Sequence, residues 1–465
     1  MSAVVAQQER RTTDSRVVLA IVAVAVVLSS LDLFIVNVAL PRIAVDFSGS
    51  QISGLSWVLN AYAIVYAALL VPAGRLGDRN GNKRTFLLGL GVFVFGSALC
   101  ALAWDTGALV AFRILQAAGA ALLTPSSLGL LLAATPAERR ATAVRLWVAF
   151  GGLGAALGPV IGGLLVELDW RWVFLVNVPL GVIALVIGWR LLPSPAGSGG
   201  TLPDGFGALM LIASVASLIL SVVKGEDWGW GSAGVIGGFV ATAAFGAAFV
   251  WSSRRHHSPV VDPGLLRVPN FVLMLGNSAL FNIAFAGMLL SAVLWMQNVW
   301  GWSALKTGLA IAPGPAVVPL VAISAGRLIA RWGVGPVLAL GGMSFAAGIV
   351  WWAQGITLHP DYVSGVLGGM ILSGIGVGLT MPTSVAAGTA GLPPQQFATG
   401  SAVLTMARQI GMAVGVAILV AVLGTPGAPQ ATLTAFHHGW YVIAGASVAA
   451  GLLGLAARLP KPAAT

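Results

Sequence analysis

Apolar segments of about 20 residues recur along the whole chain, and no other feature limits its fold so strictly. A helix of that length crosses about 30 Å of hydrocarbon, and inside a bilayer only helices and closed barrels satisfy every backbone polar group. The alternating polarity of barrel strands is absent, so the pattern favours helices. Because 58% of the 465 residues are hydrophobic and only 8% are charged, we predict an all-α integral membrane protein.

We expect fourteen transmembrane helices. Their predicted spans are 17–40, 54–73, 84–104, 107–134, 141–166, 171–192, 206–223, 232–251, 271–297, 305–329, 335–356, 362–388, 400–424 and 434–457. The stretch before the first span is polar and short, and no small-residue cleavage site closes that span. The first segment is therefore expected to be an uncleaved helix and not a signal peptide.

Two longer polar stretches, at 193–205 and 252–270, bracket the seventh and eighth helices. The simplest division has a cytoplasmic tail at 1–16, a six-helix bundle at 17–192, an inserted helix pair at 206–251, a second six-helix bundle at 271–457 and a cytoplasmic tail at 458–465. Two such bundles with a cavity between them are the usual plan of a secondary transporter. A weak internal echo supports this plan, because GRLGDRNGNKR at 74–84 is followed by GRLIARWGVGP at 326–336.

The distribution of basic residues predicts the orientation in the membrane. Of the 24 Lys and Arg residues, 19, counting Arg408, are assigned to the tails and the loops on the same side as the tails. Short cytoplasmic loops hold an excess of Lys and Arg, so both termini are expected in the cytoplasm. The net charge of +10 follows from this bias toward an anionic inner leaflet, and no nucleic-acid partner is expected.

Cofactor, metal and redox chemistry find little support in the sequence. The single cysteine, Cys100, can form no internal disulfide, and the five histidines lack the spacing of a zinc site. The glycines of GGLGAALGPVIGG follow no strand, so helix packing explains them better than a dinucleotide loop. We expect no catalytic constellation, no metal and no cofactor.

Asp32 interrupts the first apolar span, where a carboxylate costs about 2.5 to 3.5 kcal/mol on insertion scales. We predict that Asp32 binds a coupling proton, because burial moves a carboxyl toward the pH range in which it loads and releases. The alternative is a neutral Asp32 that only braces the first helix. Arg113 is the natural counter-charge, with Gln116 on the same helical face; a plain tether between the first and fourth helices is the alternative there.

Several motifs occur in a fixed order. GRLGDRNGNKR carries Gly74, Asp78, Arg79, Gly81 and Arg84 in the loop after the second helix. RILQAAGAA at 113–121 has Arg113 and Gln116, with Ala117 where glycine is more usual, and GPVIGG at 158–163 follows Gly154. LDLFIVNVALPRI, WRWVFLVNVPLG and MARQIGMAVGVAIL complete the set in the first, sixth and thirteenth helices. Together they resemble the major facilitator superfamily, in particular its 14-helix drug/proton antiporter branch.

The resemblance implies roles for two of these motifs. Gly151, Gly154, Gly158 and Gly162 form a side-chain-free stripe bent at Pro159, and in the family this motif marks exporters and shapes the interface that rocks between inward and outward states. Simple close packing is the alternative. The loop at 74–84 is expected to act as a latch that pairs Asp78 with neighbouring helix ends, the alternative being an ordinary positively charged cytoplasmic loop.

Polar and adaptable side chains mark a predicted substrate cavity. They are Asn37, Trp57, Asn60, Tyr62, Gln116, Asn277, Asn282, Met288 and Gln409. For the tryptophans, a lipid-facing aromatic belt is an equal alternative. Because the second bundle has no acidic residue within a helix core, Asp32 is the one strong candidate for both a proton and a cationic substrate group.

These observations predict a proton-coupled exporter of amphipathic organic compounds such as antibiotics or dyes, working by alternating access. It would use the proton gradient, act as a monomer among membrane lipids and lie in a bacterial inner membrane. Proton-coupled uptake of a small nutrient is the alternative function.

Overall fold

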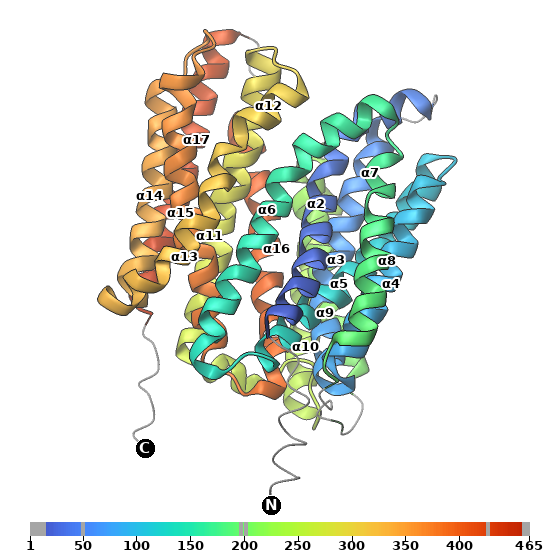
Figure 1. The fold of residues 1–465 in the computed structure, drawn as a ribbon. Coiled ribbons are helices and arrows are strands. Elements are labelled where there is room, and N and C mark those ends of the chain that lie inside the picture. Colours follow the sequence, from blue (N-terminus) through green and yellow to red (C-terminus); the bar gives the residue numbers. More distant parts are fainter. Residues whose placement is uncertain (1–14, 48–51, 195–198, 200–202, 425–427, 458–465) are drawn as a thin grey trace, which may run out of the picture.

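The computed structural model describes residues 15–47, 52–194, 199, 203–424 and 428–457, and within them the chain is helical, without strands (Figure 1). Fourteen helices are long and apolar enough to cross a membrane, which confirms the predicted number and fold class. Of the predicted site residues, the side chains of Asn37 and Pro159 fall outside the described part.

The helices follow the predicted order. The first bundle contains α2 (Ser15–Asp46), α3 (Ile52–Asn80), α4 (Asn82–Ala101), α5 (Thr106–Ala133), α6 (Arg140–Leu168), α7 (Trp172–Leu175) and α8 (Asn177–Leu191). The inserted pair is α9 (Gly205–Trp228) and α10 (Ala233–Arg255). The second bundle contains α11 (Pro269–Leu294), α12 (Ala304–Ile311), α13 (Pro313–Trp332), α14 (Val334–Gly355), α15 (Gly368–Thr389), α16 (Phe397–Leu423) and α17 (Pro429–Leu455). Short turns of 3₁₀ helix lie at Ala137–Arg139, Pro263–Arg267 and Pro394–Gln396, and π-helical turns at Trp295–Val299 and Val363–Leu367.

Two predicted spans are divided in the structure. The sixth is split into α7 and α8 just before Pro179, and the tenth into α12 and α13 at Pro313. Proline has no backbone N–H and its ring crowds the preceding turn, so it interrupts the helical hydrogen-bond ladder. The first span extends beyond its predicted limits of 17–40, because α2 continues to Asp46.

Each bundle is built around a close pair of helices. In the first bundle α2 packs along α6, and in the second α11 packs along α16. The bundles meet where α3 and α5 contact α16, and where α6 contacts α12, α13 and α15. The inserted helix α9 packs on both α3 and α16, and α10 packs on α9 (Figure 1). The inserted pair therefore covers one side of the seam between the bundles.

The internal echo in the sequence corresponds to a repeated backbone conformation. Gly81 follows α3 with φ of 95°, and Gly333, at the same place in the echo, follows α13 with φ of 86°. Residues with a Cβ atom rarely adopt such angles, so glycine is required at both turns. The echo also aligns Gly74 with Gly326, and each lies against the fifth helix of the opposite bundle, Gly74 on α16 and Gly326 on α6.

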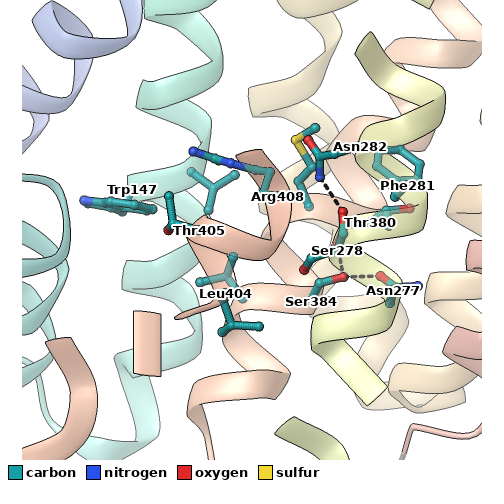
Figure 2. Close-up of a pocket in the computed structure, with 13 residues that line it drawn as sticks. Trp147, Asn277, Ser278, Phe281, Asn282, Thr380, Ser384, Leu404, Thr405 and Arg408 are labelled. Atoms are coloured by element: carbon teal, nitrogen blue, oxygen red, sulfur yellow. Dashed lines mark hydrogen bonds between the residues drawn. The ribbon is translucent and has the colours of Figure 1, made fainter. Parts of the chain in front are cut away.

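Two cavities lie between the bundles. We call the end of the molecule where α2 begins and α17 ends the terminal side (Figure 1). The larger cavity, of about 300 Å³, extends toward the opposite end, between α2, α3, α5, α9, α11 and α16. The smaller, of about 20 Å³, lies nearer the terminal side, between α6, α11, α15 and α16 (Figure 2).

Candidate functional site

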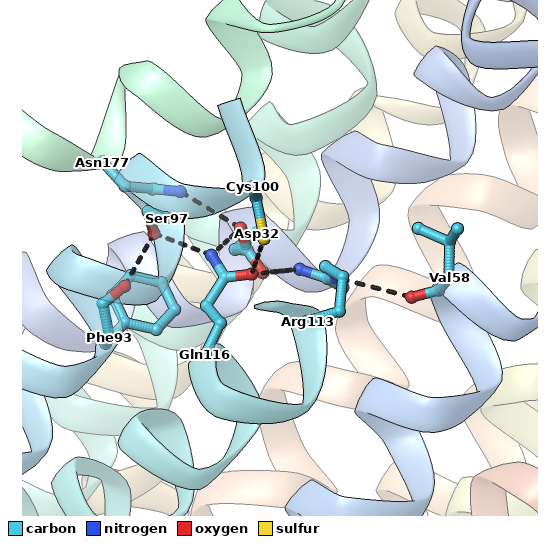
Figure 3. Close-up of polar contacts among 8 residues, drawn as sticks. All are labelled: Asp32, Val58, Phe93, Ser97, Cys100, Arg113, Gln116 and Asn177. Atoms are coloured by element: carbon cyan, nitrogen blue, oxygen red, sulfur yellow. Dashed lines mark hydrogen bonds and ion pairs between the residues drawn. The ribbon is translucent and has the colours of Figure 1, made fainter. Parts of the chain in front are cut away.

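The carboxylate of Asp32 lies at the centre of a buried polar cluster (Figure 3). Its Oδ2 accepts a hydrogen bond from Arg113 Nη1 at 2.5 Å. Its Oδ1 accepts two more, from Gln116 Nε2 at 2.8 Å and from Asn177 Nδ2 at 3.1 Å. All four side chains are fully buried. Helices α2, α5 and α8 therefore meet at a single carboxylate.

Arg113 donates three hydrogen bonds from two of its guanidinium nitrogens, Nε and Nη1. Nε donates to the backbone oxygen of Val58 at 3.3 Å, and Nη1 also donates to Gln116 Oε1 at 2.6 Å. The guanidinium carbon lies 4.0 Å from the centre of the Tyr62 ring, a cation–π distance. Nη2 has no hydrogen-bond partner among the described residues.

The donors around Asp32 satisfy both of its carboxylate oxygens. A guanidinium and two amide groups all donate to its oxygens, so the side chain needs no proton of its own to be satisfied. Removing either member of a buried ion pair leaves an uncompensated charge and costs about 3 to 5 kcal/mol. Withdrawal of these donors would leave the carboxylate of Asp32 without partners.

Sequence reasoning overlooked two members of the cluster. Asn177 donates directly to Asp32, and Ser97 accepts from Gln116 Nε2 at 2.7 Å while donating to the Phe93 carbonyl. Asn177 stands in an apolar helix, within the motif WRWVFLVNVPLG. That isolated amide could have indicated a buried polar contact. Ser97 could not be singled out from the sequence, because serine side chains commonly hydrogen-bond to the backbone of their own helix.

The ion pair borders the larger cavity. Arg113 lines that cavity together with two of the predicted substrate residues, Asn60 of α3 and Gln409 of α16. Most of the remaining wall is apolar, formed by Leu33, Phe34, Leu59, Ala63, Ile219, Val222, Val223, Trp230, Ala286, Met412, Ala413, Val416, Ala417 and Val420, with Glu226 as the one further charged residue. A mainly apolar wall with a few polar groups is typical of sites for amphipathic small molecules.

Other predicted substrate residues lie elsewhere in this conformation. Tyr62 and Gln116 are buried in the Asp32 cluster, and Trp57 lies 5.4 Å from Lys224 Nζ. Met288 is packed in the apolar core of the second bundle and lines neither of these two cavities. Asn277 and Asn282 line the smaller cavity.

The loop motif joins the two bundles at the terminal side. Asp78 Oδ1 accepts from the Ala398 backbone N–H at 3.1 Å, and Oδ2 accepts from the N–H and the hydroxyl of Thr399 at 2.8 and 2.6 Å. These are the first free N–H groups of α16, where the helix dipole favours an anion. Gly74 permits this contact, because a Cβ there would lie 2.8 Å from the Ala398 oxygen.

Arg79 and Arg84 of the motif take no part in this contact. Arg79 donates to Asn80 at 3.2 Å, and Arg84 is exposed at the start of α4. The echoed segment lacks the contact altogether, since Ala330 stands where the first segment has Asp78. The arrangement is therefore a single carboxylate that caps one helix across the bundle interface.

The glycine stripe of α6 packs within its own bundle. Added Cβ atoms would lie 2.5 Å from the Val27 oxygen at Gly154, 3.2 Å from the Leu31 oxygen at Gly158 and 3.1 Å from the Ile35 oxygen at Gly162. All three partners belong to α2, so in this conformation the stripe packs closely within its own bundle. The other face of α6 meets the second bundle, with Gly152 near Val318 and Gly163 near Leu305.

Comparisons with known proteins agree with this architecture. Residues 22–416 match the model of the Major Facilitator Superfamily. The chain belongs to the major facilitator superfamily. It is 33% identical to the multidrug resistance protein Stp of Mycobacterium tuberculosis over 398 residues, which cover 84% of this chain and 73% of Stp. It is 32% identical to the cephamycin export protein CmcT of Amycolatopsis lactamdurans over 442 residues, which cover 92% and 89% of the two chains.

A solved structure extends the agreement to the fold. The human organic anion transporter MFSD10 has a TM-score of 0.70 and 15% identity, with 95% of this chain and 99% of that chain covered. Membership in this superfamily makes the protein a multi-pass membrane carrier of the facilitator fold. The Asp32 cluster and the adjoining cavity are its candidate transport site.

Proposed function

We propose that the protein is a proton-coupled exporter of amphipathic organic compounds, such as antibiotics or dyes. The observation that carries this proposal is the position of Arg113, which binds the sealed carboxylate of Asp32 and also lines the mainly apolar cavity. A substrate in that cavity is within reach of the partner that neutralises Asp32. The names of the relatives Stp and CmcT, a resistance protein and an export protein, support the same function.

Exchange of proton for substrate follows from competition for Arg113. In the conformation described, Asp32 is paired and the terminal side is closed by Asp78 on α16. A proton arriving from the opposite end neutralises Asp32 and releases Arg113, which weakens the contacts of α5 with α2. The bundles then rock, the terminal side opens, and substrate binding drives the proton into the cytoplasm. Each inward charge supplies about 2.3 kcal/mol per 100 mV.

The terminal side is proposed to be cytoplasmic, because 18 of the 24 basic residues remain assigned to that side when Arg408, which lies within α16, is left out. The protein would then lie in a bacterial inner membrane with both termini in the cytoplasm. It would work as a monomer surrounded by lipids, with the proton gradient as its energy source and no cofactor.

Transport into inside-out membrane vesicles tests the direction of flux. With an acidic lumen, an exporter accumulates ethidium in the lumen, and a protonophore abolishes the accumulation. Uptake symport would instead drive substrate out of the acidic lumen, and that result would replace export by the alternative function. A susceptibility panel in an efflux-deficient bacterium, comparing the wild type with Asp32→Asn, then identifies the compounds exported.

A further inference from the structure

Arg408 is a second arginine deep in the membrane-spanning part of the protein. The sequence analysis counted it with the cytoplasmic loops, which is wrong, because α16 begins at Phe397 and Arg408 lies eleven residues further along it. It makes no hydrogen bond or ion pair with any residue that the structure describes, and its Nε is buried without a partner. Its side chain extends from α16 between Trp147 of α6 and Asn282 of α11 (Figure 2).

The two intramembrane arginines differ in their partners. Arg113 has a carboxylate, an amide oxygen and a backbone oxygen, whereas Arg408 has none of these among the described residues. A guanidinium cannot lose its proton in a protein, and a cation within a membrane-spanning bundle is costly without an anion. A binding role for an anion from outside the chain explains why such a residue stands there.

Neutral polar residues line the smaller cavity together with Arg408. Asn282 of α11 is 2% exposed, and its Nδ2 donates to the Ser278 backbone oxygen. Ser278 and Thr405 add hydroxyl groups to the same wall, and no acidic residue lines the cavity. A guanidinium beside hydroxyl groups and an amide N–H provides hydrogen bonds for an anion and no competing carboxylate.

We propose that Arg408 and this polar wall form a subsite for the anionic group, such as a carboxylate, of an amphipathic substrate. The inference rests on the proposed export function and narrows its substrate class to include organic anions and zwitterions. The Asp32 centre, by contrast, offers a carboxylate to a proton.

The subsite is closed in the conformation described. Its volume of about 20 Å³ is room for a water molecule and not for a substrate. The first bundle contributes only Trp147 and Val148 of α6 to the lining, and all other lining residues belong to the second bundle. Separation of the bundles at the terminal side therefore removes one wall and exposes the polar surface. Substrate would bind there from the cytoplasm and be expelled as the wall returns.

Binding of two dyes to purified full-length protein tests the proposal. Fluorescein and rhodamine 123 share a xanthene framework, but fluorescein is an anion and rhodamine 123 a cation, and the anisotropy of each reports binding. We expect Arg408→Gln to weaken fluorescein binding about tenfold or more and to leave rhodamine 123 within about twofold. Arg408→Lys should be intermediate, since an ammonium keeps the charge and loses the planar donor pair.

Two further variants guard against a folding artefact. Thr405→Val removes the hydroxyl that lies three residues before Arg408 on α16, keeps the charge of Arg408, and should weaken fluorescein binding about threefold. Arg331→Gln neutralises an exposed arginine at the end of α13 and should change neither dye. Equal losses of both dyes in Arg408→Gln, or no loss of fluorescein, would overturn the subsite.

Replacing gluconate by chloride in the buffer separates an inorganic anion from an organic one. An Arg408-dependent response to chloride without fluorescein binding overturns the assignment to organic substrates. Failure of the export function gives a different pattern. If fluorescein binding depends on Arg408 but no proton-driven efflux is found, the export function is wrong and the subsite stands. If rhodamine 123 is exported by the proton gradient but fluorescein binding does not depend on Arg408, only the subsite is wrong.

Discussion

Asp32 and Arg113 stand 81 positions apart in the chain, yet the carboxylate of one meets the guanidinium of the other at 2.5 Å, with both side chains fully buried. Such a pair has a consequence for mutagenesis: neither member can be changed without leaving the other charged and unpaired. The role of Asp32 in coupling therefore has to be measured separately from its role in stability.

Asp32→Asn is expected to abolish proton-driven efflux and also to destabilise the protein by about 3 to 5 kcal/mol, because Arg113 keeps its charge. The double variant Asp32→Asn/Arg113→Gln should recover most of that stability and remain uncoupled. Thermal unfolding of purified protein and dye efflux from energised cells measure the two effects. Efflux against a gradient by the stable double variant would show that Asp32 is not the coupling residue.

Asp78→Asn is expected to favour opening at the terminal side. The substitution removes the charge that caps α16, a change of about 2 kcal/mol, or roughly thirtyfold in the equilibrium between conformations. In a Cys100→Ala background, a cysteine at Thr405 should then react faster with a maleimide and one at Asn60 more slowly. Thr399→Val, which keeps the backbone N–H groups, is the matched variant and should shift both rates less. Unchanged rates in Asp78→Asn would exclude the latch.

Gly154→Val is expected to destabilise the first bundle by more than about 3 kcal/mol, because even its Cβ would lie 2.5 Å from the Val27 oxygen. Gly91→Val provides the control, since a Cβ at Gly91 has no neighbour within 4 Å. The melting temperatures of the two variants make the comparison. Equal melting temperatures would show that α2 and α6 separate easily.

Ala417→Phe is expected to block efflux without loss of stability. Ala417 lines the larger cavity, and an aromatic ring there occupies space that a substrate needs. Ala244→Phe places the same ring on an exposed position of α10 and should transport normally. If Ala417→Phe exports ethidium at the wild-type rate, the larger cavity is not the substrate path.

The sequence was sufficient for those parts of the site in which few partners are available. A charge in an apolar span can be satisfied by very few residues, so Asp32 could be paired with Arg113. Asn177 and Ser97 escaped notice because uncharged polar residues satisfy themselves in many ways within a helix. Arg408 stands near the expected start of a helix at residue 400, and counting by position could not show that it lines a cavity with three other helices.

For the fold, the number of helices could be predicted from the sequence, but the contacts between helices could not. Hydrophobic length determined the number of helices, because every crossing segment has to span the same thickness. The partner of the Gly154 stripe was not predictable, since a side-chain-free face fits any helix that approaches closely. Asp78 was expected at a helix end, but which helix it caps depends on how the two bundles meet.

The glycine contacts of α6 with α2 have a mechanical consequence. The three successive close contacts between the backbones of α2 and α6 leave no side chains between these helices, so the pair moves as one rigid unit. In this unit α2 carries Asp32, and α6 contacts α12, α13 and α15 of the second bundle. A displacement of α2 on protonation of Asp32 would then move α6 against the second bundle directly, without a series of rotamer changes in between.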